Sequence, residues 1–148
     1  MDINEVIKNK KQYLPLLLLA DEQESMIDLY LDRGRMFVLK DSGTAQAVCV
    51  VTDEGNNILE IKNLAVETNA QRKGYGRLLI EYIVDNFKDD YKVLEVGTGD
   101  SLLTVPFYEK CGFKKSRVLS RFFLDNYNDP IYEDGKQLID MIYLKRKL

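Results

Sequence analysis

The chain contains no histidine, and this absence excludes several classes of enzyme. Hydrolases that use a Ser-His-Asp triad or a Cys-His pair need an imidazole, and so do metal sites with histidine ligands. Acid or base catalysis must therefore use Asp, Glu, Tyr, Lys, Cys or water. Cysteine is scarce as well, since only Cys49 and Cys111 are present, without CxxC spacing. We expect both to be reduced thiols in the core, and we expect no metal site.

Long apolar runs and an excess of basic residues are also missing. The longest apolar run, residues 14–20, includes Pro15 and is too short to cross a bilayer. Residues 1–5 show no basic segment followed by an apolar one, so we expect no signal peptide. The net charge of −3 argues against general affinity for nucleic acid, which needs a basic surface. We therefore expect a cytoplasmic protein that binds neither membranes nor nucleic acid.

The first part of the chain predicts helices followed by antiparallel strands. Residues 2–12 favour a short polar helix. Asp21 and Glu24 have the spacing of a capping box, which predicts a second helix that ends at Gly34. Three apolar strands separated by turn residues then follow, over residues 35–40, 45–52 and 58–66.

The second part of the chain alternates helices and strands. Apolar residues from Leu78 to Phe87 recur at helical spacing. After this helix we expect a strand, a shorter helix, a long strand and a last strand, over residues 91–96, 102–111, 113–124 and 138–144. We expect the shorter helix to begin near Thr104, because Pro106 is tolerated only in a first turn. The pattern predicts one domain over residues 1–148, of the α/β (α+β) class, with a mixed sheet and two crossover helices.

The segment before the first of these helices is rich in glycine and basic residues. It reads Gln71-Arg72-Lys73-Gly74-Tyr75-Gly76-Arg77. A helix N-terminus presents unpaired N–H groups, and glycine lets a backbone approach a phosphate closely. The segment matches neither a P-loop nor the dinucleotide fingerprint. It therefore predicts a cradle for phosphate or pyrophosphate, or else a tight turn with solvated charges.

Two motifs in this order resemble the GNAT superfamily of N-acetyltransferases. A strand that ends in Leu64-Ala65-Val66, followed by the turn at residues 71–76, resembles motif A of that family. One helix and one strand later, the segment from Phe107 to Phe113, with Tyr108 and Gly112, looks like motif B. The two motifs together are more specific than either alone.

This resemblance implies a GNAT fold and acetyl-CoA as the acyl donor. The fold would be a mixed, mostly antiparallel sheet of about six to seven strands with about four flanking helices. Strand four (residues 58–66) and strand five (residues 91–96) would splay apart, and CoA would lie in the gap between them. Many members carry an asparagine just after strand five, where this chain has Asp100 and Ser101.

The resemblance also implies which residues bind the donor. Backbone amides of residues 72–77 would hold the pyrophosphate, and the N–H of Val66 would contact the thioester carbonyl. The implied set is Leu64, Ala65, Val66, Gln71, Arg72, Lys73, Gly74, Tyr75, Gly76, Arg77, Ser101 and Tyr108.

Two residues are candidates for catalysis. Tyr108 would serve the leaving thiolate, because a phenol can donate to it as the C–S bond breaks, although Tyr108 could instead be a core aromatic. Glu60 would be the base that accepts the amine proton, with Glu67 as a weaker alternative. Simple strand alternation makes Glu60 an exposed strand residue paired with Lys62, whereas a bulge of one extra residue in this strand would flip its facing.

The acceptor is expected to be an amine of a small molecule or a peptide. The acidic and aromatic loop at residues 125–135 could attract a polyamine, an aminoglycoside or a lysine side chain, or could be a solvated turn. An alternative function is a non-catalytic sensor or regulatory protein that binds acyl-CoA. A further alternative is an unrelated phosphate-binding module. We expect a monomer or a homodimer.

Overall fold

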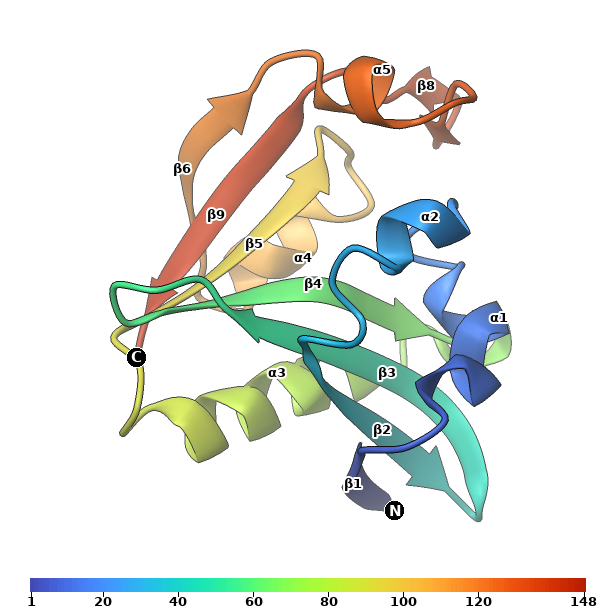
Figure 1. Cartoon of the computed structure of the whole chain (residues 1–148), viewed down its shortest axis with the longest axis vertical. Helices are drawn as coiled ribbons and strands as arrows, with labels where there is room; N and C mark the ends of the chain where they lie inside the picture. The colour runs from blue at the N-terminus through green and yellow to red at the C-terminus, as the bar shows by residue number, and fades with distance from the viewer.

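The computed structural model describes all residues from 1 to 148 and contains one large sheet. This sheet has seven strands in the order β1-β2-β3-β4-β5-β9-β6 (Figure 1). Its strands are β1 (Asp2–Val6), β2 (Arg35–Asp41), β3 (Thr44–Asp53), β4 (Ile58–Val66), β5 (Val93–Gly99), β6 (Lys114–Leu119) and β9 (Met141–Lys147). Only β4 and β5 pair in parallel, and the small hairpin β7 (Tyr132–Glu133) with β8 (Lys136–Gln137) stands apart. The mixed sheet expected from the sequence is confirmed.

Helices cover both faces of the sheet. The longest, α3 (Tyr75–Phe87), connects β4 to β5 and packs on one face together with α4 (Val105–Lys110). The short helices α1 (Leu14–Leu17) and α2 (Glu24–Ile27) pack on the opposite face, over β2, β3 and β4. The remaining elements are the 3-10 turns η1 (Lys10–Tyr13) and η2 (Thr68–Ala70) and the helix α5 (Phe122–Asn126). No helix is both long enough and apolar enough to span a membrane.

Alternating residues of β2 and β3 divide the core into two clusters. Phe37 and Cys49 face α3, whereas Val38 and Val48 face α1 and α2. Because side chains alternate along a strand, these central strands are apolar on both faces and are covered on both. The two helical layers therefore each have their own apolar contact with the same strands.

The sheet splits between β4 and β5. Their parallel pairing covers only residues 58–61 of β4 and 93–96 of β5, although both strands continue beyond it. On its other edge β5 pairs with β9 along its whole length (Figure 1). The expected splay between strands four and five is therefore confirmed, and it opens a gap at the ends of these two strands.

A bulge in β4 changes the facing of its second half. Ile61 pairs with Val51 and Asn63 pairs with Val50, so Lys62 is an extra residue. Before the bulge Ile61 packs in the cluster under α3, and after it Val66 packs against the same cluster. Glu60 therefore lies on the opposite face from Val66, as the bulged alternative required.

The N-terminal prediction was wrong in both of its helices. Residues 2–12 form β1 and η1, because β1 pairs along its whole length with the edge of β2. The second helix is only α2, and its N-cap is Gln23, without a capping hydrogen bond. Asp21 does not cap it, since its carboxylate accepts hydrogen bonds from Tyr30 and Tyr127.

Strand boundaries in the second half also needed correction. The predicted strand 113–124 ends as β6 at Leu119, because Arg121 takes a left-handed conformation with φ of 58° and α5 follows. The expected strands at 91–96 and 138–144 are β5 and β9, each displaced toward the C-terminus. The expected start of α4 is confirmed, with Thr104 as its N-cap and Pro106 in its first turn.

Candidate active site

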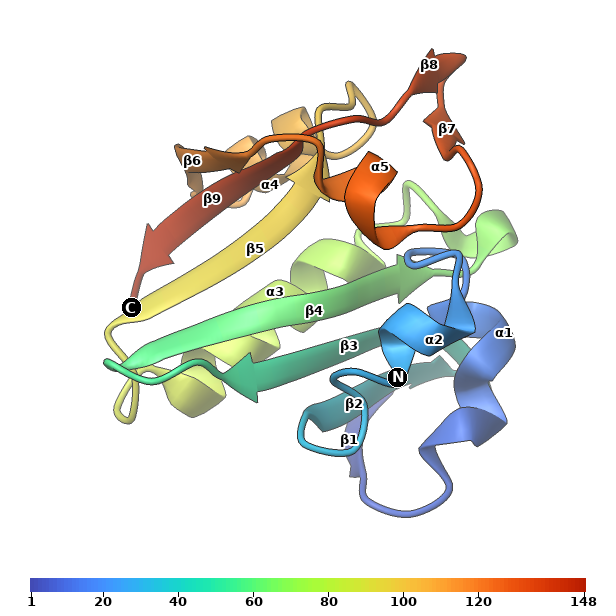
Figure 2. The same cartoon turned by 45° about the horizontal axis from the view of Figure 1, so that its top comes forward.

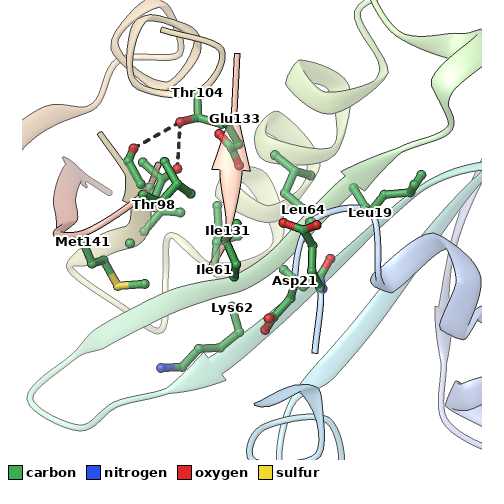
Figure 3. A pocket seen from close by; sticks show the side chains of 18 of the residues that line it. Leu19, Asp21, Ile61, Lys62, Leu64, Thr98, Thr104, Ile131, Glu133 and Met141 are labelled. Atoms are coloured by element: carbon green, nitrogen blue, oxygen red, sulfur yellow. Dashed lines mark hydrogen bonds between the residues drawn. The ribbon is translucent and has the colours of Figure 1, made fainter. Parts of the chain in front are cut away.

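A cavity of about 230 Å³ lies at the gap between β4 and β5. Residues 61–66 of β4 and residues 96–99 of β5 form two of its walls (Figure 3). Residues 19–22, which precede α2, form a third, and residues between α5 and β9 close it from the far side. Segments from most of the chain therefore meet around one space.

The glycine-bearing turn leads into α3 near this gap. Arg72 and Gly74 adopt left-handed conformations, with φ of 67° and 85°. Gly74 is the N-cap of α3, no side chain caps the helix, and its first turn carries no acidic residue. The N–H groups of the first turn are thus free of side-chain acceptors, as in an anion site.

The basic residues of this turn are unpaired. Arg72, Lys73 and Arg77 are exposed, and none lies within 4 Å of a carboxylate. Together with the uncapped helix start, they form a positively charged edge on an acidic protein.

Gly76 has a different task from the rest of the turn. A Cβ at this position would lie 3.1 Å from Cζ of Phe107 and 3.6 Å from Cγ2 of Val66. The glycine therefore allows α3 to approach both α4 and the end of β4 closely. It positions the turn against the gap through packing, whereas Gly74 does so through its backbone conformation.

Tyr108 lies at the wall of the cavity. Its ring is buried between Phe107 and Phe113, at centroid distances of 5.1 and 5.6 Å. Burial raises the pKa of Tyr108 above its usual value. The phenol therefore stays protonated at neutral pH and can donate a hydrogen bond into the cavity.

Comparison with known proteins identifies the family. Residues 32–115 match the sequence model of the acetyltransferase (GNAT) domain. The chain belongs to the GNAT acetyltransferases. The resemblance inferred from the two motifs is thereby confirmed, and so is the assignment as an enzyme.

Individual relatives agree over nearly the full length of the chain. An uncharacterized N-acetyltransferase of Bacillus subtilis, YvbK, is 34% identical over 87% of this chain and 84% of its own. The structure of an IAA acetyltransferase from Bacillus cereus is 35% identical, with a TM-score of 0.93 over 99% of both chains. A GNAT family acetyltransferase from Elizabethkingia anophelis, solved with acetyl-CoA bound, is 34% identical, with a TM-score of 0.94 over 99% of this chain and 97% of its own.

In this GNAT acetyltransferase Glu60 does not line the cavity. Its side chain is buried, and its Oε2 lies 2.8 Å from Nζ of Lys62 and accepts a hydrogen bond of 3.4 Å from Tyr143. Burial raises the pKa of Glu60, and the ammonium of Lys62 opposes that rise. Lys62 itself does line the cavity. The bulge places Glu60 on the face opposite Val66, and there its carboxylate is buried and paired with Lys62.

Ser101 is part of the turn that leads to α4. Its side-chain oxygen accepts a hydrogen bond from the N–H of Leu103, and its carbonyl accepts from Thr104 and Val105. It is buried and does not line the cavity. On either side of this turn, Thr98 and Thr104 do line the cavity, and their hydroxyls share a 2.8 Å hydrogen bond at its wall (Figure 3).

Sequence reasoning missed several polar residues of the cavity. Asp21 was assigned to a helix cap, and Asn63 carried no motif. Thr98 and Thr104 precede motif B and belong to neither motif. Glu133 belongs to the acidic loop at residues 125–135, and the charge of that loop was the one sequence signal that pointed to any of these residues. Their grouping depends on strand splay and loop packing, which no local pattern encodes.

Proposed function

We propose that the chain transfers the acetyl group of acetyl-CoA to a primary amine, with both substrates bound at once. The observation that carries this proposal is the cavity at the splayed ends of β4 and β5, with Tyr108 at its wall. The cationic start of α3 lies at the same end of β4, which suits a ligand with phosphates at one end and a reactive group at the other. Relatives with acetyl-CoA bound support the choice of donor.

The donor would lie along β4 and the start of α3. Backbone N–H groups of residues 72–77, with the side chains of Arg72, Lys73 and Arg77, would hold the pyrophosphate. Leu64, Ala65 and Gln71, which line the cavity, would contact the pantetheine arm. Tyr75 and Gly76 are buried and would support the turn, as Ser101 supports the turn after β5.

The reaction would proceed by direct attack. The amine nitrogen forms a bond to the thioester carbon, and the carbonyl oxygen takes up negative charge, which the N–H of Val66 would stabilise by about 2.7–4 kcal/mol. The C–S bond then breaks, and its electron pair goes to sulfur. Tyr108 would donate a hydrogen bond to that sulfur. The nitrogen gives up its extra proton as the amide forms, and the thiolate takes up a proton from solvent and leaves as the thiol. The products are an N-acetylated amine and CoA.

The proton of the amine has two possible destinations. Glu60 as general base stays a prediction, and its pairing with Lys62 means that it would receive the proton through water. Alternatively, the amine loses its proton to solvent before it attacks. Replacement of Glu60 by glutamine distinguishes the two routes.

Thiol release tests the proposal as a whole. The purified protein is mixed with acetyl-CoA and a panel of small amines and lysine-containing peptides, and free thiol is followed with time. We expect release above the hydrolysis rate with at least one amine class, together with a mass gain of one acetyl group on that amine. If CoA binds in calorimetry but no amine releases thiol, the chain is a non-catalytic acyl-CoA-binding protein.

A further inference from the structure

The cavity carries three carboxylates without a matching cation. Asp21, Glu22 and Glu133 all line it, and none has a Lys or Arg nitrogen within 4 Å. The only basic side chain of the lining is Lys62, whose charge is already taken by Glu60 at 2.8 Å. The space next to the gap is therefore strongly negative.

The structure holds Asp21 firmly in this position. Tyr127 donates a hydrogen bond of 2.6 Å to its Oδ1, and Tyr30 donates one of 3.0 Å to its Oδ2. The hydroxyl of Tyr30 in turn accepts a hydrogen bond from Asn63. Burial raises the pKa of Asp21, and burial followed by the charges of Glu133 and Asp21 raises the pKa of Glu22. A bound cation would relieve this repulsion.

Two buried acceptor atoms at the cavity have no donor. Asn63 is only 3% exposed and lines the cavity, and its amide nitrogen donates to Leu17 and Tyr30 while its Oδ1 has no partner. The Oε2 of Glu133 is likewise buried without a partner. An unpaired buried acceptor is costly, and no side-chain donor is left unpaired in the same way. These two oxygens therefore lack N–H donors, which a ligand would have to supply.

The rest of the lining suits methylene groups. Apolar side chains from four segments surround the carboxylates (Figure 3). They include Leu19, Phe123, Ile131, Leu138 and Met141. Carboxylates beside apolar side chains fit a short aliphatic chain that carries an ammonium group.

On the basis of the proposed function, we infer that the acceptor is an aliphatic diamine or polyamine. One amine, in its neutral form, attacks the thioester at the gap. The second, as an ammonium, lies among Asp21, Glu22 and Glu133 and donates to the unpaired oxygens of Glu133 and Asn63. These carboxylates are specificity residues, because they hold the end of the acceptor that does not react.

Matched acceptors test this inference directly. With acetyl-CoA saturating, kcat/KM is measured for 1,4-diaminobutane and for 4-amino-1-butanol, which has the same length and only one charge. We expect the diamine to be favoured by about tenfold or more, since a hydrogen bond to a charged group is worth about 1.5–3 kcal/mol. Equal values for the two acceptors, or a lysine peptide preferred to both, would overturn the inference.

Charge-removing variants locate the ammonium. Glu133→Gln and Glu22→Gln should raise KM for the diamine by about tenfold, and should raise KM for the amino alcohol much less, because its hydroxyl carries no charge. The matched control is Glu109→Gln on α4, an exposed and unpaired glutamate outside the cavity. An equal rise in KM for both acceptors would show that these glutamates have a structural role and do not bind the ammonium.

Calorimetry separates this inference from the proposed function. Binding of 1,4-diaminobutane to the protein–CoA complex is measured for the parent and for Glu133→Gln. If amino alcohols are acetylated but the diamine neither binds tightly nor reacts better, only the inference fails. If the diamine binds through Glu133 but no amine releases thiol, the ammonium site stands and the proposed catalysis fails.

Discussion

At the scale of single residues, the hydroxyl of Tyr108 is the group whose role depends most on its surroundings. Burial raises its pKa, so full transfer of its proton to a thiolate, whose thiol has a pKa near ~8.5, is unfavourable. A hydrogen bond from the protonated phenol to the developing thiolate remains favourable throughout the reaction. The phenol is therefore better suited to stabilise the leaving group than to ionise.

Replacing Tyr108 by phenylalanine removes only this hydrogen bond. The ring contacts with Phe107 and Phe113 are kept, so the protein should fold as before. We expect kcat for thiol release to fall by roughly 10- to 150-fold, because a hydrogen bond to a charged group is worth about 1.5–3 kcal/mol. CoA affinity and the melting temperature serve as controls. An unchanged kcat, with chemistry limiting, would make Tyr108 a packing residue.

Replacing Glu60 by glutamine separates its two possible roles by their kinetic signature. If Glu60 only neutralises Lys62, the variant frees a positive charge at the cavity wall, and KM for a cationic amine should rise severalfold at unchanged kcat. If Glu60 is the base, kcat should fall instead while CoA affinity stays the same. Because Glu60 is paired with Lys62, we expect the rise in KM. The measurements are kcat and KM for the amine and the pH profile of kcat/KM, with CoA affinity as the control.

At the scale of elements, the start of α3 concentrates positive charge where β4 ends. The helix has no capping side chain and no acid in its first turn, and the preceding turn supplies unpaired cations. An exposed charge pair is worth only about 0.2–1 kcal/mol, so no single cation decides the affinity. The backbone N–H groups and the several cations must act together.

Charge reversal at Lys73 tests this arrangement without touching the packing of α3. Lys73 is exposed. Its replacement by glutamate removes one attraction to the phosphates and adds one repulsion, each of about 0.2–1 kcal/mol. We therefore expect Kd for CoA to increase by about two- to thirtyfold at low salt, with a smaller effect at high salt. Lys8→Glu, an equally exposed reversal before η1, is the control. Identical CoA affinity in both variants would show that the phosphates of CoA do not bind at this turn.

At the scale of the whole molecule, the two sides of the split sheet are tied together over the gap. Tyr127 donates to Asp21, and the N–H of Asn128 donates to Gln23 at 2.9 Å, so the segment after α5 meets the segment before α2 (Figure 2). These partners lie more than 100 residues apart in the chain. Beyond their short pairing, β4 and β5 do not hydrogen-bond, so the cavity depends on this bridge for its closed shape.

Loss of the Tyr127 hydroxyl should weaken this bridge. A hydrogen bond to a charged group contributes about 1.5–3 kcal/mol, so Tyr127→Phe should lower the free energy of unfolding by about that amount or less. Urea unfolding measures it. The control is Tyr132→Phe in the same region, whose side chain is 60% exposed. Equal stability of the two variants would mean that the bond to Asp21 adds nothing to the fold.

The sequence was sufficient for the family, the glycine-bearing turn before α3 and the central strands. Motif A and motif B are local patterns, because a helix N-terminus with glycine and basic residues presents its N–H groups through short-range geometry. Strands β2 and β3 also carry their pattern locally, as apolar runs. The start of α4 followed from the restriction that Pro106 places on its own helix.

Tertiary structure alone decided the edge strand, the facing of Glu60 and the polar lining of the cavity. Residues 2–6 become β1 only because β2 offers an unpaired edge, and a lone polar segment contains no sign of that partner. Asp21, Asn63 and Glu133 meet because β4 and β5 diverge and the segments before α2 and after α5 pack over the gap. Such contacts join residues far apart in the chain, and their energies come from burial and long-range hydrogen bonds, which a local pattern of residues does not encode.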